Sequence, residues 1–140
     1  MSVIIPQSHL DLIEEPICAV LTTMMPDGQP QSSLVWCDYD GESIQVNTTR
    51  QRQKGENMAQ NPKVSLLVID PKDSGRWIEV RGEVEITELG ALEHLDQITR
   101  QYTDSPCYYG YVYPVEQRDK ETRIICMIRP NKVNLDAVHK

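Results

Sequence analysis

Hydrophobic and polar residues alternate most regularly in the segment 76–87. Successive side chains of a β-strand point to opposite faces, so this alternation predicts a strand with one buried face. The face predicted to line the core carries Ile78, Val80, Gly82, Val84 and Ile86. The opposite, outward face carries Trp77, Glu79, Arg81, Glu83 and Glu85.

Shorter runs of β-compatible residues fill much of the remaining chain. They predict further strands at 17–23, 31–38, 43–47, 63–69, 123–129 and 132–135. Pro26-Asp27-Gly28 and Asp40-Gly41 are typical hairpin turns, and they separate the first three of these runs. The strands therefore follow one another closely, as in an antiparallel sheet.

Three helical segments are predicted between the strands. Ser8 is expected to cap a short helix over 9–15, which Pro16 ends because a proline disfavours helical geometry in the preceding residue. A helix of about nine residues ends near Asn61-Pro62. The segment 88–102 has Leu92 beside one apolar stripe made of Ala91, Leu95, Ile98 and Tyr102.

Tight turns and few helices favour a mainly β fold over a layered α/β fold, whose parallel strands need repeated helical crossovers. We predict an antiparallel closed or split β-barrel of six to seven strands with peripheral helices. The interior of so small a barrel is filled by side chains. A ligand of flavin size is therefore expected outside it, in a groove completed by a second subunit.

Length and composition fit one globular domain over residues 1–140, with 39% hydrophobic and 25% charged residues. The net charge of −7 argues against nucleic-acid binding. Neither a secretion signal nor a membrane-length apolar run occurs, so a cytoplasmic protein without membrane association is expected. No metal site is predicted, and structural thiols are expected at Cys18, Cys37, Cys107 and Cys126.

The clearest candidate for binding chemistry is the segment 48–54. Thr48 and Thr49 contribute two hydroxyls, and Arg50, Arg52 and Lys54 contribute three cations, between a predicted strand and a predicted helix. The first amide groups of a helix lack backbone partners and carry partial positive charge, which suits a phosphate. A solvated polar loop is the alternative reading of the same residues.

Trp77 lies beside Arg81 on the outward face of its predicted strand. Tryptophan in that setting is frequent at subunit interfaces, so an interface anchor is expected. Packing of Trp77 under the terminal helix of its own chain is the alternative.

Motifs in a fixed order along nearly the whole chain resemble the pyridoxamine 5′-phosphate oxidase-like FMN-binding split barrels. They are Asp27-Gly28-Gln29-Pro30, Ser32-Ser33-Leu34-Val35-Trp36, the segments 52–58 and 61–66, and Glu79-Val80-Arg81-Gly82. The subgroup named for the deazaflavin coenzyme F420 is resembled through His94-Leu95-Asp96, Tyr102-Thr103 and Ile128-Arg129-Pro130-Asn131-Lys132-Val133.

The resemblance implies a homodimer with two cofactor sites at its interface, for either FMN or F420. Arg52 and Lys54 match the family's phosphate-binding positions, and Thr48 and Thr49 would add hydroxyl donors. The residues whose backbone would run along the ring system are Ser32, Ser33, Leu34, Val35, Val46 and Asn47. The closing groups from the other subunit would be Trp77 and Arg81, whereas Arg50 lies beyond the matched pattern.

The implied activity is hydride transfer between the bound cofactor and a small unsaturated substrate. The sequence shows no catalytic triad, and His94 is expected to be partly exposed rather than catalytic. The candidate proton donors are water and Tyr108, Tyr109 or Tyr111, within a tyrosine-rich segment 102–113 that is a candidate substrate lid.

Two further functions are open at this stage. One is a carrier or sensor protein that binds FMN or F420 without turnover. The other is a ligand-free dimeric scaffold whose basic segment contacts only solvent.

Overall fold

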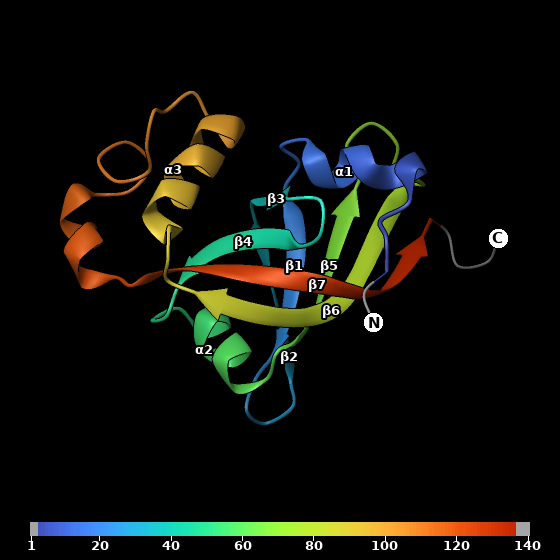
Figure 1. Cartoon of the computed structure of the whole chain (residues 1–140), viewed down its shortest axis with the longest axis horizontal. Helices are drawn as coiled ribbons and strands as arrows, with labels where there is room; N and C mark the ends of the chain where they lie inside the picture. The colour runs from blue at the N-terminus through green and yellow to red at the C-terminus, as the bar shows by residue number, and fades with distance from the viewer. Residues whose placement is uncertain (1–2, 137–140) are drawn as a thin grey trace.

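The computed structural model describes residues 3–136 and contains seven strands. They are β1 (Ala19–Met24), β2 (Pro30–Val35), β3 (Cys37–Tyr39), β4 (Ile44–Thr49), β5 (Lys63–Ile69), β6 (Trp77–Thr87) and β7 (Arg123–Leu135). All pairings are antiparallel, in the order β2-β1-β5-β6-β7-β4-β3. The predicted mainly β architecture is confirmed (Figure 1).

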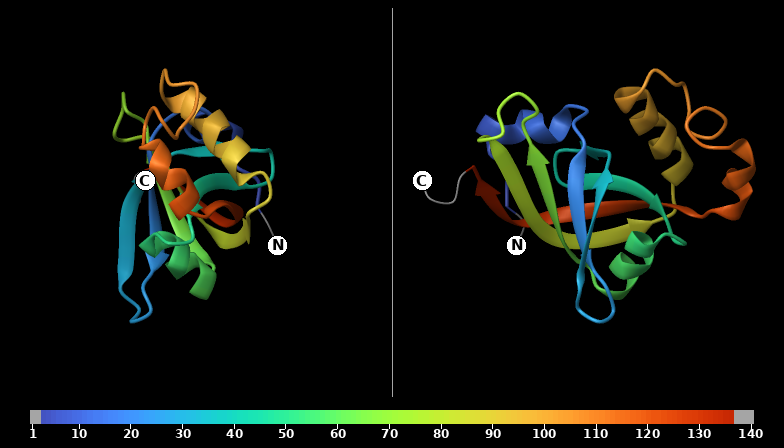
Figure 2. Two further views of the ribbon diagram at one scale, coloured as in Figure 1. Left: turned by 90° about the vertical axis from the view of Figure 1, so that its left-hand side faces the viewer. Right: turned by 180° about the vertical axis from the view of Figure 1, so that it is seen from behind.

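The sheet curls because its two edge strands are neighbours in the sequence. Only Trp36 separates Val35 of β2 from Cys37 of β3, although β2 and β3 lie at opposite ends of the strand order. Each residue extends a chain by at most about 3.6 Å, so the two edges must meet at this corner. Within residues 3–136 they meet without pairing, which gives the predicted split barrel (Figure 2).

Helices cover the ends and one side of the barrel. They are η1 (Gln7–His9), α1 (Leu10–Glu14), α2 (Gln53–Gln60), α3 (Ala91–Tyr102) and η2 (Val115–Lys120). Figures 1 and 2 show α1 and α2 at opposite ends of the sheet, with α3 and η2 standing to one side. Of the helices in residues 3–136, none has both the length and the apolar composition needed to cross a bilayer.

The core lies inside the curled sheet, and β6 supplies the face that its alternation predicts. Ile78, Val80 and Val84 are buried, and Ile86 is half-buried against them. Further core residues come from the other strands and from α1, among them Leu12, Ile13, Leu21, Ile44, Val46, Leu66, Val68, Ile124 and Ile128.

Two predicted strand boundaries are wrong. The run 31–38 divides at Trp36 into β2 and β3, and the two strands predicted at 123–129 and 132–135 form the single strand β7. Pro130, which lies between the two predicted strands, pairs with Gly82 beside a register irregularity. A Cβ on Gly82 would collide with the Arg129 carbonyl, so the missing side chain lets β6 and β7 stay paired there.

Two predicted helix starts are also wrong. Ser8 makes no capping hydrogen bond, because its hydroxyl contacts the His9 ring, and α1 begins only at Leu10 after a 3₁₀ turn. The third helix begins at Ala91 rather than at 88, since Gly90 has a φ of 74° that a helix cannot contain.

The four cysteines fall into two environments. Cys37 and Cys126 are buried, and burial raises the pKa of each thiol to about 12, as expected for structural residues. Cys107 is half-buried. Cys18 differs from the prediction, because it precedes β1 and is exposed instead of lying inside a buried strand.

Candidate functional site

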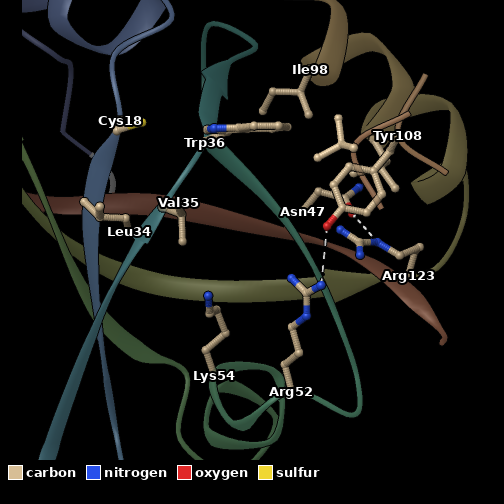
Figure 3. A pocket seen from close by; sticks show the side chains of 12 residues that line it. Cys18, Leu34, Val35, Trp36, Asn47, Arg52, Lys54, Ile98, Tyr108 and Arg123 are labelled. Atoms are coloured by element: carbon tan, nitrogen blue, oxygen red, sulfur yellow. Dashed lines mark hydrogen bonds between the residues drawn. The ribbon is translucent and has the colours of Figure 1, made fainter. Parts of the chain in front are cut away.

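A pocket of about 200 Å³ opens beside the β2–β3 corner, between α3 and the start of α2 (Figure 3). Whole ligand sites commonly measure about 300 to 1,000 Å³, so this pocket suits one part of a larger ligand. The residues that line it are Cys18, Leu34, Val35, Trp36, Asn47, Arg52, Lys54, Leu95, Ile98, Tyr108, Val112 and Arg123.

Trp36 forms one wall, and Tyr102 fixes its position. The Tyr102 hydroxyl lies 2.9 Å from the carbonyl oxygens of Ile17 and Cys37 and accepts a hydrogen bond from the Cys37 amide at 3.1 Å. The Tyr102 ring stacks on the Trp36 indole with centroids 5.3 Å apart. The end of α3 therefore holds the corner at which the barrel splits.

The opposite side of the pocket is cationic. Arg52, at the end of the turn between β4 and α2, and Lys54, in the first turn of α2, point into the pocket (Figure 3). Gly55 allows this tight turn, because a Cβ there would overlap the carbonyl of Thr49. Thr49 closes the turn, since its hydroxyl accepts a hydrogen bond from the Arg52 amide at 3.0 Å.

The pKa of Lys54 is lowered, first by burial and then by the positive charges of Arg52 and Arg123. Charged Lys54 is therefore electrostatically unfavourable in the free protein. An anion in the pocket would remove this penalty.

Arg123, the first residue of β7, is the most buried cation of the pocket. Its side chain is only 3% exposed, and its guanidinium lies 5.1 Å from the centre of the Tyr108 ring. Its Nε donates to Asn47 Oδ1 at 2.9 Å. Within residues 3–136, its Nη1 has no hydrogen-bond partner, which is costly for a buried charged donor.

One carboxylate faces both arginines of the pocket. Glu121 lies 3.8 Å from Arg52 Nη2 and 3.8 Å from Arg123 Nη1, longer than a hydrogen bond in each case. The Tyr109 hydroxyl donates to Glu121 at 2.7 Å and so holds the carboxylate in place. Three lining cations and one nearby carboxylate leave a local excess of two positive charges.

A chain of hydrogen bonds continues from Arg123 to Asp38. Arginine only donates, so Asn47 must turn its oxygen to Arg123 and its nitrogen to His94 Nδ1, 3.1 Å away. The same nitrogen donates to the Ala91 carbonyl at 2.8 Å. His94 Nδ1 must then accept, and its Nε2 carries the proton and donates to Asp38 Oδ1 at 3.0 Å.

The expectation that His94 is partly exposed is wrong. The residue is 7% exposed, because its ring lies between Asn47 and Asp38. A histidine on an amphipathic helix gives no sign of such partners when they come from distant strands.

The structure brings some of the predicted site residues to the pocket. Leu34, Val35, Asn47, Arg52 and Lys54 line it. Those outside its lining are Ser32, Ser33, Val46, Thr48, Thr49, Trp77 and Arg81.

The predicted hydroxyl groups have other surroundings. Ser32 Oγ lies 2.8 Å from Thr22 Oγ1 on the neighbouring strand. Thr48 is buried, and within residues 3–136 its hydroxyl has no hydrogen-bond partner. The part of these hydroxyls in ligand binding stays a prediction.

Trp77 and Arg81 lie on β6, away from this pocket. Trp77 is half-buried, and its amide donates to Asp136 Oδ1 at 3.1 Å. Arg81 is exposed, pairs with Glu79 at 3.3 Å and lines a separate groove with Lys63. Their contribution to a partner's site stays a prediction.

Arg50 also points elsewhere. It is exposed, and its Nε donates to Glu88 at 2.6 Å.

Sequence reasoning missed Arg123 as a site residue and did not assign a role to Trp36. The available signal for Arg123 was a lone arginine before the apolar run 124–128. A cation at the start of a core strand is seldom buried unless it is paired. Trp36 was visible only as part of a motif.

Fold and pocket together define a split β-barrel with a cationic pocket at its split corner. The family model described as pyridoxamine 5′-phosphate oxidase matches residues 5–135. The chain therefore belongs to the pyridoxamine 5′-phosphate oxidase family, and the predicted resemblance is confirmed.

Individual relatives differ in how much of them the chain covers. A solved structure described as an F420 reductase is 34% identical, with a TM-score of 0.80 over 93% of this chain and 98% of that chain. A conserved hypothetical protein from Mycobacterium tuberculosis shares the fold at 24% identity, with a TM-score of 0.71 over 96% of this chain and 86% of that chain.

A curated pyridoxine/pyridoxamine 5′-phosphate oxidase from Nostoc sp. is 28% identical over 107 residues. These residues are 76% of this chain but 43% of that protein, so the match spans less than half of the curated relative.

Proposed function

We propose that the protein is a flavin- or deazaflavin-dependent oxidoreductase that transfers a hydride between its bound cofactor and a small unsaturated substrate. The observation that carries the proposal is the cationic pocket, which Arg52, Lys54 and Arg123 line and in which the Glu121 carboxylate faces only the two arginines. FMN and F420 both present a phosphate, which such a pocket would complement. Similarity to an F420 reductase over nearly the whole chain supports F420 as the first cofactor to test.

The residues present fit a phosphate-bearing group. The unfavourable charge of Lys54 and the buried Nη1 of Arg123, which lacks a hydrogen-bond partner within residues 3–136, both suit a bound anion. Arg52 and Lys54 would hold the phosphate, and the apolar side chains of Leu34 and Val35 would border the ring system.

The chemistry supplied by the bound cofactor is hydride transfer between its central ring and an electron-poor carbon of the substrate. The chain's own residues would bind, orient and exclude water. Trp36, Leu95 and Ile98 are among the apolar residues that line the pocket, and a drier pocket strengthens the contacts of its cations.

Of the three candidate tyrosines, Tyr108 suits proton donation best. Its ring lines the pocket, and its hydroxyl lies 3.5 Å from Arg52 Nη2, at the limit of a hydrogen bond. The Tyr109 hydroxyl is already donated to Glu121, and burial raises the Tyr109 pKa to about 12. Tyr111 is 65% exposed and outside the pocket lining.

We also propose a homodimer that completes the cofactor site. Leu34 lines the pocket and is 71% exposed, which is unusual for a leucine at a binding site and would be relieved by a second subunit. The small pocket volume supports the same arrangement. A cytoplasmic location stays a prediction from the sequence.

The test is a fluorescence titration of the purified protein with FMN and with F420. The reduced form of the tighter ligand is then offered to a panel of quinones and α,β-unsaturated carbonyl compounds. Micromolar or tighter binding with consumption of reduced cofactor supports the proposal. Binding without turnover on the panel would favour a carrier or sensor, and binding of neither cofactor would leave a dimeric scaffold.

A further inference from the structure

We propose that Arg123 is a third anion-binding residue of the pocket, and that Asp38, His94 and Asn47 form a positioning chain that fixes its guanidinium. The ligand chemistry is a phosphate group. The assignment of this phosphate to FMN or F420 rests on the proposed function. The geometry of the hydrogen bonds from Asp38 to Arg123 is independent of it.

The first argument is the state of the Arg123 guanidinium. Nε is held by Asn47, and the guanidinium carbon lies over the ring of Tyr108. Nη1 is buried and lacks a hydrogen-bond partner within residues 3–136, and Glu121 is too distant to supply one. Arg123 lines the pocket, so a phosphate bound there would offer its guanidinium an acceptor.

The second argument is charge. Arg52, Lys54 and Arg123 with Glu121 leave a local excess of two positive charges. A phosphate monoester, such as that of FMN, carries about −1.5 to −2 charges at pH 7. The pocket therefore complements a phosphate better than it complements a single carboxylate.

The third argument is that each hydrogen bond between Asp38 and Arg123 fixes the donor and acceptor of the next one. Asp38 accepts from His94 Nε2, so Nδ1 is the acceptor nitrogen of an imidazole that carries one proton. That nitrogen accepts from the Asn47 amide, so the Asn47 oxygen faces Arg123. Reversal of the Asn47 amide would place an N–H against the arginine and break the contact.

Two variants of His94 separate positioning from packing. His94→Asn keeps an acceptor near the position of Nδ1, whereas His94→Gln keeps a donor near the position of Nε2 and loses that acceptor. Both remove the imidazole and have similar packing defects. We expect His94→Asn to bind cofactor within about threefold of wild type, and His94→Gln to bind about tenfold more weakly.

Arg123→Met tests the ligand contact directly. A hydrogen bond to a charged group is worth enough to predict a Kd that is about 10- to 100-fold higher. Arg129→Met is the matched control, because Arg129 lies on the same strand, is 59% exposed and pairs with Glu85 at the surface. It should bind within about twofold of wild type.

The assay is fluorescence titration with FMN and F420, together with calorimetric titration of inorganic phosphate. Equal cofactor affinity of wild type and Arg123→Met would overturn the inference and leave the proposed function standing. Phosphate binding that requires Arg123, without binding of either cofactor, would support the inference and overturn the proposed function.

If Arg123→Met does not fold, the two His94 variants provide the test of the inference. Equal affinities of these two variants for cofactor or phosphate would show that His94 acts only through packing, and the positioning chain would be refuted.

Discussion

Replacement of Lys54 by methionine should move stability and binding in opposite directions. Lys54 has a lowered pKa because of burial and the nearby arginines, so its charge opposes folding of the free protein. Methionine keeps the unbranched stem and removes the charge. We expect the free variant to be at least as stable as wild type.

The sign follows from proton linkage. Between the lowered pKa of folded Lys54 and the ordinary value of 10.5, the unfolded chain binds more protons than the folded one. Stability from this group therefore rises as the pH rises through that window, and below it the full penalty is present. At neutral pH, Lys54→Met removes the penalty.

Binding should respond in the opposite sense. A hydrogen bond between the ammonium group and a phosphate contributes about 1.5 to 3 kcal/mol, which corresponds to a Kd about 10- to 150-fold higher in the variant. Urea unfolding measures the first effect, and fluorescence titration with FMN and F420 measures the second. The control is Lys72→Met, because Lys72 is exposed in the β5–β6 turn, outside the pocket.

Two results would refute this reasoning. An unchanged Kd for cofactor would remove Lys54 from the phosphate site. A loss of more than about 1 kcal/mol of stability in the free variant would show that Lys54 has a structural role, because it exceeds the usual effect of a surface substitution.

Three further predictions concern the stability of the fold. Tyr102→Phe should lower the free energy of unfolding by about 1 to 3 kcal/mol in urea, because the Cys37 amide loses its acceptor. Gly55→Ala should destabilise by more than about 2 kcal/mol and weaken cofactor binding, because its methyl group overlaps the Thr49 carbonyl; equal melting temperatures would contradict this. Arg76 lowers the pKa of Asp11 by hydrogen bonding, so stability from this pair is present above about pH 3.8 and is lost as pH falls through the lowered value. Acid unfolding of Arg76→Met should therefore show a shallower pH dependence below pH 4.

The alternation along 76–87 was sufficient to predict β6, because one face of this strand packs against the core over almost its whole length. The break at Trp36 was not predictable in the same way. Val35 and Cys37 are both buried, so the period of two runs through the corner unchanged. The strand ends there because the closing sheet changes direction, which is a property of the whole barrel.

The residues of the candidate site also differ in whether local sequence patterns predict them. Arg52 and Lys54 were predictable because the cations and the strand-to-helix turn lie within one short segment. Asp38 and His94 were not, because a hydrogen bond between them joins a short edge strand to a distant helix. Local pattern carries no information about such a contact.

Arg123 shows which physical constraint completes the pocket. In the β4–β7 ladder, Arg123 lies opposite Thr49, where β4 ends and the cationic turn begins. The pairing of Val46 with Cys126 and of Ile44 with Ile128 places buried side chains together along the same ladder. A slip of one residue would expose these core residues and turn Arg123 to the other face. The register that buries the core is therefore also the register that brings the third cation to Arg52 and Lys54.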